Sequence, residues 1–416
     1  QAPIREYGQI SETAKELKLL SMFAHDYGET FCNMQPQFAG DDCESTSVHT
    51  GDFQDAEDLS AFRMITRRSG DRGYLFVNNY QRGYEMAEHK DVMLRVQTAD
   101  GKISFPKQDI KNGAYFFYPF NFPLSDDVTL RWINQTPLCN INQKLWFFYG
   151  IDKMQYEADE KLSGQVLISM DRTWAKCAWC MKKYPNILFF ITLPILETEN
   201  GIEVICRSDH AQKNCWIIMD ATVEDVKTWI DNGWKKSDII PDFLHVEGDA
   251  STICVLSHDL AAADNQTVAS FTHTDVNNCI IRKEKNVFDR AEKTDFSMEE
   301  ACAIDDTGKD YREYVIRISY DKAYDAVKGN IFLRIDFQAD QAELYLNGEK
   351  IADQYYIGDV WEVSLKRFDF PTELILRLYP LEEDDKIYLE TQPDYLNGRC
   401  CSLKDIRCVY ECKEKL

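Results

Sequence analysis

The sequence lacks an apolar run long enough to cross a membrane. Its longest runs, near Ile187–Leu196 and Leu145–Tyr149, have the length of a strand, whereas a membrane span needs about 20 residues. Basic residues are also scarce: 47 Lys and Arg stand against 70 Asp and Glu, which gives a net charge of -23. Because nucleic acid and anionic membranes repel a polyanion, we expect neither as a main partner. A neutral ligand fits this charge better.

The first residues lack the features of a signal peptide. The segment QAPIREYG has no basic region, no apolar region and no initiator Met. We therefore expect the chain to be a mature product or a fragment of a longer protein.

Recognisable metal-ligand spacing is missing as well. None of the seven histidines has metal or triad spacing: His25, His49, His89, His210, His245, His258 and His273. The 14 cysteines are scattered, and several, such as Cys139, Cys206 and Cys254, lie in apolar runs. That distribution is typical of buried free thiols in a reducing cytosol. We predict a cytoplasmic protein without a cofactor or a metal site.

Two groups of cysteines keep a functional alternative open. Cys177-Ala-Trp-Cys180 has redox or zinc spacing, although no second such pair follows it. Near the end of the sequence, four cysteines could close a disulfide or hold a metal: Cys400, Cys401, Cys408 and Cys412.

The overall composition indicates a folded, strand-rich protein. Hydrophobic residues make up 44% of the chain and charged residues 28%, as in ordinary globular proteins. The aromatic content of 12% is high, and aromatic residues favour strands. A length of 416 residues has room for two to four domains.

Residues 11–28 give the clearest helical pattern. Ser11 and Thr13 are candidate N-caps, and Gly28 is a candidate C-cap. Apolar residues recur at helical spacing in one stripe: Ala14, Leu17, Leu20 and Ala24. We interpret residues 1–28 as the end of a domain whose remainder is missing. Such a helix would be marginal unless it docks on the next domain.

Strand patterns dominate the rest. Residues 29–57 are polar and acidic and predict a linker, whereas residues 58–143 predict a β-sandwich. In that region strands at 61–66 and 74–79 flank a turn at 69–73, and Asp100-Gly101 turns a strand at 92–98 back on itself.

Residues 144–305 predict a second β-rich domain with a helical insertion at Thr222–Asn232. Its strand-like segments are Leu145–Tyr149, Gly164–Ser169, Ile187–Ile191, Ile202–Cys206, Trp216–Met219 and Thr252–Ser257.

Residues 306–416 predict the last domain, and residues 310–392 within it carry the cleanest alternation of apolar and polar positions. One face of a strand is formed by Ile331, Leu333, Ile335 and Phe337, and another by Leu374, Leu376 and Leu378. One-sided burial of this kind is typical of an antiparallel sandwich. The predicted fold is therefore mainly β, with two to three antiparallel β-sandwich domains preceded by one short helix.

Three segments of this last region resemble the galactose-binding-like jelly roll. They are Ala342-Glu-Leu-Tyr-Leu-Asn-Gly-Glu-Lys350, Gly358-Asp-Val-Trp-Glu-Val363 and Pro371-Thr-Glu-Leu-Ile-Leu-Arg-Leu-Tyr-Pro380. Modules of this type either bind a sugar or serve a packing role, and both alternatives stay open here.

Two further segments are more specific. Ala2-Pro-Ile-Arg-Glu-Tyr-Gly8 and the helix behind it resemble the passage into the last barrel helix of the β-galactosidases of glycoside hydrolase family 35. Phe76-Val-Asn-Asn-Tyr-Gln-Arg82, with the segments 88–92, 103–106 and 119–121, resembles the β domain that follows the barrel in bacterial members. The resemblance implies that residues 1–28 are the end of a (β/α)8 barrel. The family usually has an acidic residue where this chain has Gln1.

The resemblance also implies a retaining glycosidase whose two catalytic carboxyl groups, about 5 Å apart, lie upstream of residue 1. We predict no catalytic residue in this chain, no activity for the chain alone, and binding of a β-galactoside through the missing barrel. A homo-oligomer is possible. The acidic stretches Asp41-Asp42 and Glu382-Glu383-Asp384-Asp385 are interpreted as solubilising turns, with a calcium site as the alternative.

Two other sets of residues are candidate sites. Trp132, Trp146, Trp216 and Trp361 lie in strand patterns and are predicted to be core residues rather than sugar platforms. The sequons at Asn134 and Asn265 matter only in a secretory pathway.

The sequence leaves three hypotheses for the chain. It is the β portion of a β-galactosidase, an independent carbohydrate-binding protein, or a structural part of a glycosidase-like protein without activity.

Overall fold

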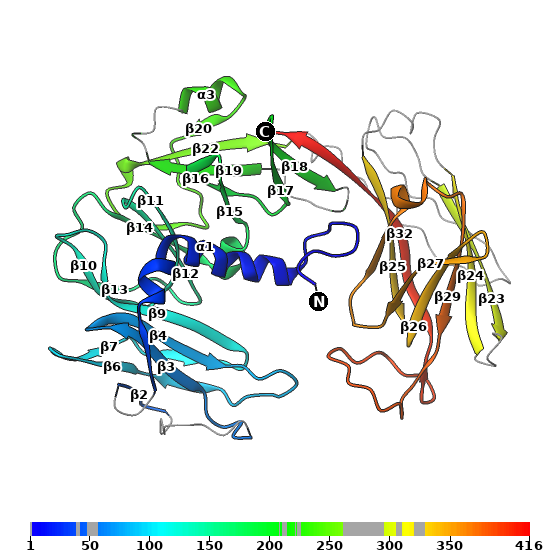
Figure 1. Ribbon diagram of the computed structural model, residues 1–416, viewed down its shortest axis with the longest axis horizontal. Coiled ribbons are helices and arrows are strands. Elements are labelled where there is room, and N and C mark those ends of the chain that lie inside the picture. Colours follow the sequence, from blue (N-terminus) through cyan, green and yellow to red (C-terminus); the bar gives the residue numbers. More distant parts are fainter. Residues whose placement is uncertain are drawn as a thin grey trace. The chain divides into compact units, whose positions relative to one another are not determined.

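The computed structural model describes residues 2–38, 42–47, 57–207, 209, 214–220, 222, 226–260, 295–304, 310–319 and 329–416. It is mainly β, with 54% strand and 11% helix, as the sequence predicted. The chain divides into two compact units whose elements are labelled in Figure 1. Unit 1 contains residues 1–192 and 214–259, and unit 2 contains residues 193–213 and 260–416.

Unit 1 contains one sandwich-like part built on a six-stranded sheet of order β1-β3-β4-β9-β10-β13. Its strands are β1 (Gln35–Phe38), β3 (Arg63–Ser69), β4 (Arg72–Asn79), β9 (Ala114–Pro123), β10 (Thr129–Ile133) and β13 (Tyr156–Ala158). Shorter strands complete this part: β2 (Cys43–Ser45), β5 (His89–Val92), β6 (Leu94–Thr98), β7 (Gly101–Ser104) and β8 (Gln108–Ile110). The predicted hairpins are confirmed, because β3 pairs with β4 and β6 pairs with β7.

A second part of unit 1 has two further sheets. The four-stranded sheet is formed by β11 (Thr136–Ile141), β12 (Leu145–Gly150), β14 (Val166–Asp171) and β21 (His245–Gly248). The five-stranded sheet is formed by β15 (Ala178–Met181), β16 (Tyr184–Phe190), β19 (Asn214–Asp220), β22 (Ile253–Asp259) and β20 (Lys235–Ser237). Strands β12 and β14 are parallel, whereas the other pairings in these two sheets are antiparallel.

Three short helical segments connect these strands: α2 (Arg172–Ala175), α3 (Val226–Asp231) and a 3-10 turn (Ala250–Thr252). The predicted helical insertion corresponds to α3; residues 223–225, which precede it, lie outside the described part of the chain.

Helix α1 (Glu12–Cys32) begins at the predicted N-cap. The Ser11 side chain accepts a hydrogen bond from the backbone N–H of Ala14. The helix does not stop at Gly28 but continues to Cys32, with Asn33 as its C-cap. The Asn33 side chain donates to the carbonyl of Glu29 and satisfies one of the last free carbonyls.

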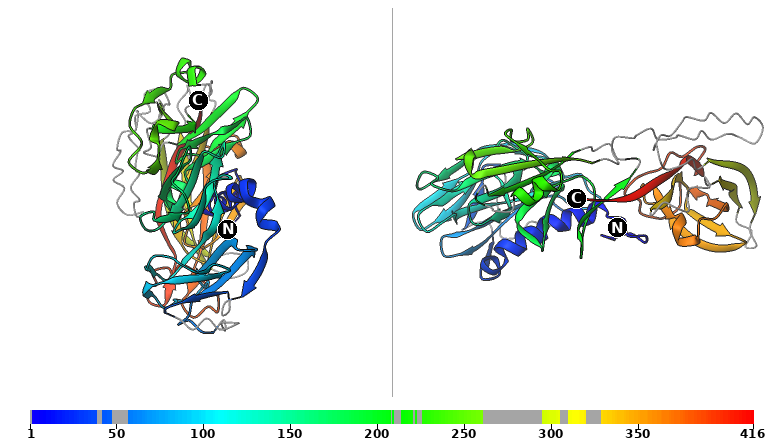
Figure 2. Two further views of the ribbon diagram at one scale, coloured as in Figure 1. Left: turned by 90° about the vertical axis from the view of Figure 1, so that its left-hand side faces the viewer. Right: turned by 90° about the horizontal axis from the view of Figure 1, so that it is seen from above.

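The face of α1 that packs on unit 1 differs from the predicted stripe. Its buried residues are Leu19, Met22, Phe23 and Tyr27. Leu17 and Leu20, members of the predicted apolar stripe, are 47% and 57% exposed. Figures 1 and 2 show α1 along one outer face of unit 1. The helix therefore has two apolar faces, of which unit 1 covers one.

The buried face of α1 contributes residues to two hydrophobic cores. Leu19 and Met22 enter the core between the four- and five-stranded sheets. Phe23 and Tyr27 enter a second core with residues of β4, β9, β10 and β12. The predicted condition for a stable helix, docking on the following domain, is met by this packing.

Unit 2 is a jelly-roll-like sandwich of two five-stranded sheets. One is formed by β17 (Ile195–Thr198), β18 (Gly201–Arg207), β32 (Ser402–Lys415), β25 (Asn330–Gln338) and β28 (Trp361–Ser364). The other is formed by β23 (Asp295–Ile304), β24 (Asp310–Ser319), β29 (Glu373–Tyr379), β26 (Gln341–Leu346) and β27 (Glu349–Tyr355). A 3-10 turn (Leu365–Phe368) and the short pair β30 (Leu381–Glu382) and β31 (Arg399–Cys400) complete it.

The alternation of buried and exposed positions in the strands of unit 2 follows the prediction with one difference. In β25 the positions Ile331, Leu333, Ile335 and Phe337 are buried, but Phe332 is buried too. The predicted turn at Asn347-Gly348 joins β26 to β27, and both residues have positive φ, as a tight hairpin requires.

The division of the chain differs from the predicted boundaries. Helix α1 and residues 144–192 and 214–259 belong to unit 1, whereas residues 193–213 belong to unit 2. The reason is that β18 pairs with β32, a partner distant in sequence. The predicted linker at 29–57 also contains the end of α1 and the strands β1 and β2.

In the described part of the chain, no helix combines the length and apolar character needed to cross a membrane.

Candidate functional site

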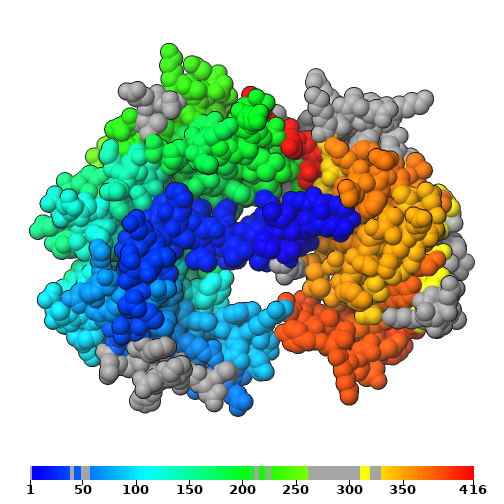
Figure 3. Space-filling view, in the orientation of Figure 1, coloured from blue at the N-terminus to red at the C-terminus, as the bar shows by residue number. Residues whose placement is uncertain are grey.

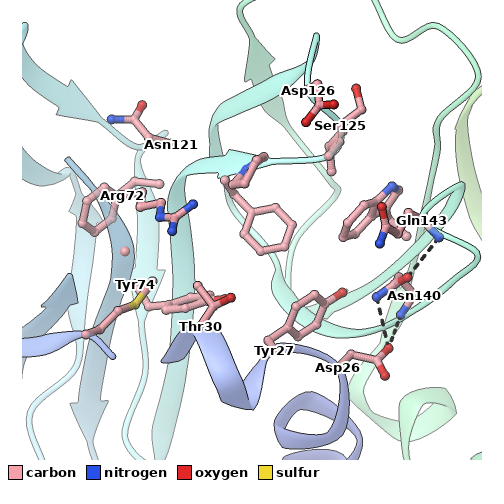
Figure 4. Close-up of a pocket in the computed structure, with 17 residues that line it drawn as sticks. Asp26, Tyr27, Thr30, Arg72, Tyr74, Asn121, Ser125, Asp126, Asn140 and Gln143 are labelled. Atoms are coloured by element: carbon pink, nitrogen blue, oxygen red, sulfur yellow. Dashed lines mark hydrogen bonds between the residues drawn. The ribbon is translucent and has the colours of Figure 1, made fainter. Parts of the chain in front are cut away.

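A cavity of about 390 Å³ lies in unit 1 where the second half of α1 meets the sheets (Figure 4). Helix α1 contributes Asp26, Tyr27 and Thr30. The remaining wall comes from β4, from the end of β9 and its connection to β10, and from the β11–β12 hairpin, with residues such as Arg72, Tyr74, Phe122, Asn140 and Trp146.

Asp26 connects helix α1 by hydrogen bonds to the β11–β12 hairpin on the other side of the cavity. One carboxylate oxygen accepts from the backbone N–H of Asn140 at 2.6 Å and from its side-chain amide at 3.3 Å. The amide oxygen of Asn140 in turn accepts from the backbone N–H of Gln143 at 3.1 Å. Figure 4 shows this chain of contacts along one side of the cavity. Asp26 thus acts as an acceptor that fixes the hairpin, and its second oxygen contacts His25.

Two aromatic residues in the wall carry unpaired polar atoms. Tyr27 and Trp146 are 7% and 5% exposed, and their rings stack at 6.4 Å between centroids. Among the described residues, neither the Tyr27 hydroxyl nor the Trp146 indole N–H has a hydrogen-bond partner. Burial raises the pKa of Tyr27 well above its ordinary value, so the phenol stays protonated. An unpaired buried donor costs about 1–3 kcal/mol, which a polar group that enters the cavity can offset.

The rim of the cavity is polar. Arg72 and Asp126 are exposed, and Asn121 donates to the carbonyl of Asp71 at 2.7 Å. Amide groups, one guanidinium and aromatic walls suit a small neutral polar ligand. The two carboxylates of the wall do not form an acid–base pair, because Asp26 is held by Asn140 and Asp126 lies on an exposed loop.

A second polar cluster, the unit 2 ion network, consists of Arg207, Asp209, Arg334 and Glu362. Arg207 binds Glu362 with two bonds of 2.6 and 3.1 Å and Asp209 with one of 3.2 Å. Arg334 binds the same two carboxylates at 2.6 and 3.1 Å. The side chains of Asp209 and Glu362 are only 10% and 11% exposed.

This network does not suit glycosidase chemistry. A retaining glycosidase needs one carboxyl group that donates a proton, whereas both carboxylates here accept bonds from guanidinium groups. Burial raises the pKa of the neighbouring Glu411, and the Arg207 charge opposes that shift. The contacts fit a role in holding β18, β25 and β28 together.

The two cysteines of Cys177-Ala-Trp-Cys180 do not bind each other. The Cys177 thiol donates to the carbonyl of Thr173 at 3.3 Å. The Cys180 thiol instead has a hydrogen bond with Cys139, which raises the pKa of Cys139 together with burial. In this structure the two thiols of the motif therefore have separate partners.

Lys18 of α1 lies beside these thiols in an unusual environment. Its ammonium is 3.6 Å from the centroid of the Trp179 ring and donates to the carbonyl of Lys176 at 2.7 Å. Burial lowers the pKa of Lys18 to about 7.

This shift predicts a pH dependence of stability. Between pH 7 and 10 the unfolded chain holds a proton on Lys18, whose ordinary pKa is about 10.4, and the folded chain does not. The contribution of Lys18 to the free energy of unfolding should therefore rise with pH across that window, whereas buried thiols such as Cys43 and Cys408, whose pKa values are raised, act in the opposite direction above about pH 8.5. In Lys18→Met the slope of the unfolding free energy against pH should be less positive than in the wild type, and in the exposed control Lys102→Met it should match the wild type. Urea unfolding at pH 7, 8, 9 and 10 measures it; equal slopes in all three proteins would contradict the shift.

The four cysteines near the end of the chain have separate surroundings. Cys400 donates to the carbonyl of Gln338 at 3.1 Å, and Cys401 donates to that of Leu378 at 3.4 Å. Cys408 is buried, and all four are free thiols. Over the residues described here, no three His, Cys, Asp or Glu side chains lie close enough to share a metal ion.

The acidic stretches are only partly solvated turns. Asp42 binds Thr66 and Arg68 and is 15% exposed, so it contributes a structural contact. Glu382 pairs with Arg399 at 3.0 Å, whereas Glu383 and Asp384 are exposed as expected. Asp41 lies outside the described residues.

The remaining sequence candidates have structural surroundings. Trp146 and Trp361 are buried and Trp132 and Trp216 pack against cores, which confirms them as core residues. His89 is buried and contacts Ser47, as a structural histidine would. Asn134, the first sequon residue, is 5% exposed and bonded to Lys153 and Gln155, so it is inaccessible as a glycosylation acceptor. His49, His210, His273 and Asn265 lie outside the described residues.

Sequence reasoning missed the cavity. Its key contact joins Asp26 to Asn140 across 114 positions, and no local spacing signals such a pair.

Comparison with known proteins assigns the chain to no family. No protein-family model matches the chain, and no curated protein matches it either.

Proposed function

We propose that this chain is the non-catalytic β-domain portion of a β-galactosidase-like glycoside hydrolase, in which α1 is the last helix of a catalytic (β/α)8 barrel and packs on the rest of that barrel. The observation that carries the proposal is the uncovered apolar face of α1. Leu17 and Leu20 are 47% and 57% exposed, and Figure 3 shows the outer side of the helix uncovered. A helix with apolar residues on two faces is suited to lie between two packed bodies.

The sequence resemblance indicates which domain would cover the exposed face of α1. Residues 2–8 and 76–121 resemble the passage from the barrel to the β domain in family 35 β-galactosidases. The β-sandwich parts and the jelly-roll-like unit 2 are compatible with that order. In this proposal the two catalytic glutamates belong to the barrel, and the β domains brace it.

The coding sequence that precedes residue 1 tests the proposal first. We expect it to encode a (β/α)8 barrel with two glutamates at strand ends, and we expect the barrel-containing protein to hydrolyse nitrophenyl β-galactoside. This chain alone should show no hydrolysis. A start codon directly upstream, or a barrel-containing protein without activity on any β-galactoside, would overturn the proposal.

A substitution on α1 tests the packing directly. Leu20→Asp should change the unfolding free energy of this chain by less than about 0.5 kcal/mol, because Leu20 is exposed. In the barrel-containing protein the same change would bury an unpaired charge and should cost several kcal/mol. Urea unfolding of both proteins measures the difference. Leu19→Asp is the matched control, since Leu19 is 2% exposed and its loss should destabilise both. If Leu20→Asp changed the free energy of unfolding by the same small amount in both proteins, this would argue against a barrel on the face of α1 that contains Leu20.

A second candidate function is carbohydrate binding by the chain itself. It is favoured by the unit 1 cavity, whose wall holds the unpaired donors of Tyr27 and Trp146. Titration of galactose or lactose into this chain, followed by calorimetry, should then show saturable binding that Trp146→Phe weakens. Absence of heat and of any shift in melting temperature would count against this candidate.

A further inference from the structure

Two cysteines of unit 2 lie directly opposite each other on neighbouring strands. Cys206 of β18 and Cys412 of β32 are register partners in an antiparallel pair. Opposite residues in such a pair have Cα atoms about 4.5–5.5 Å apart, which falls within the range of about 4.4–6.8 Å found across disulfides. The Cys206 thiol donates to a carboxylate oxygen of Glu414, two positions along β32 from Cys412, at 3.8 Å. The backbone pairing therefore places the two cysteines at a separation that a disulfide can span.

The two thiols differ in access and in acidity. Cys206 is 4% exposed, whereas Cys412 is partly exposed. Interaction with the Cys206 thiol lowers the pKa of Cys412, although burial and the charges of Glu414 and Glu411 oppose that shift. Interaction with Cys412, burial and the Glu414 carboxylate, to which the Cys206 thiol donates, raise the pKa of Cys206. Because the thiolate is the reactive form, Cys412 is suited to attack a small disulfide first. Cys206 is then suited to attack the mixed disulfide that forms on Cys412.

We propose that Cys206 and Cys412 form a reversible disulfide, with Cys412 as the thiol that reacts first with a low-molecular-weight disulfide. The Cys412 thiolate attacks one sulfur of the small disulfide and releases one small thiol, which leaves a mixed disulfide on Cys412. The Cys206 thiolate then attacks the Cys412 sulfur, closes the protein disulfide and releases the second small thiol. Two protein thiols are oxidised, and one small disulfide is reduced to two thiols.

The bond would join two distant segments of unit 2. Strand β32 already pairs with β25 on its other side, so the bond would fix β18 to the centre of this sheet. A disulfide between positions so far apart in sequence restricts the unfolded chain strongly. Oxidation should therefore stabilise unit 2, and reduction should release that constraint.

The other cysteines provide internal controls. Cys408 lies on the same strand β32 and is 5% exposed, and burial raises its pKa to about 12. It should stay unreactive under conditions that oxidise the Cys206–Cys412 pair.

The test uses this chain, glutathione disulfide at neutral pH and mass spectrometry of proteolytic peptides. We expect a peptide that joins Cys206 to Cys412, and a melting temperature that rises by several degrees and returns after treatment with dithiothreitol. Cys408→Ser should behave like the wild type. Cys206→Ser should accumulate glutathione on Cys412, and Cys412→Ser should form neither product.

Several outcomes would overturn the proposal. They are full alkylation of both thiols after exposure to glutathione disulfide, a stable glutathione adduct on wild-type Cys412, or linkage of Cys412 to another cysteine. Circular dichroism of each variant ensures that the comparison concerns folded protein.

Discussion

Replacement of Phe23 by alanine is expected to lower the free energy of unfolding of unit 1 by about 3–5 kcal/mol. Phe23 is 3% exposed and lies at the centre of an aromatic cluster. Its ring centroid is 4.8 Å from that of Phe117, 5.3 Å from Tyr27, 5.4 Å from Tyr74 and 5.6 Å from Phe31. The substitution removes a large buried side chain and leaves a cavity that these rigid rings fill poorly. It would also detach the second half of α1 from the sheets.

Urea unfolding followed by tryptophan fluorescence measures this loss. Leu20→Ala is the matched control on the same helix, and it should change the unfolding free energy by less than about 0.5 kcal/mol because Leu20 is 57% exposed. If the two variants were equally stable, the orientation of α1 described above would be wrong.

Loss of one charge from the unit 2 ion network should lower the free energy of unfolding of unit 2 by about as much as Phe23→Ala lowers that of unit 1. In Glu362→Gln, Arg207 loses its paired contact with the carboxylate and Arg334 loses another. Because these side chains are 10–20% exposed, a guanidinium without its counter-charge is poorly solvated. Removal of one partner from a buried ion pair costs about 3–5 kcal/mol, and we expect a loss near that range for unit 2.

An exposed ion pair in the same unit provides the comparison. Glu373 pairs with Arg317 at 3.2 Å, but the two side chains are 58% and 46% exposed. Glu373→Gln should therefore cost less than about 1 kcal/mol. Thermal and urea unfolding of both variants distinguish the two environments. A small effect of Glu362→Gln would mean that water screens the network and that it does not hold the strands.

The parts of the fold that could be predicted from sequence depend on local rules. The Asn347-Gly348 turn and the Ser11 cap were found because a positive φ or a capping hydroxyl favours few residue types. Alternation in β29 was found because one side of that strand is buried and the other is not.

The failures share one physical cause, which is contact between residues far apart in the chain. The apolar stripe at Leu17 and Leu20 is visible in the sequence, but Phe23 packs inward because aromatic residues of β4 and β9 receive it, and Leu19 enters the core between the four- and five-stranded sheets. The cavity depends on Asp26 and Asn140, and the unit boundary depends on the pairing of β18 with β32. Helical or strand periodicity contains no information about such partners.

The pairing of β18 with β32 has a consequence for how the chain is made. Cys206 and Glu414, neighbours across that pair, are separated by 208 positions. At a synthesis rate of about 5–20 residues per second, β18 leaves the ribosome roughly 10–40 s before its partner strand exists. During that interval one edge of β18 offers unpaired backbone groups to any other strand nearby. Unit 2 must therefore finish folding after synthesis reaches β32, and a chaperone that shields β18 in the meantime would raise the yield of native protein.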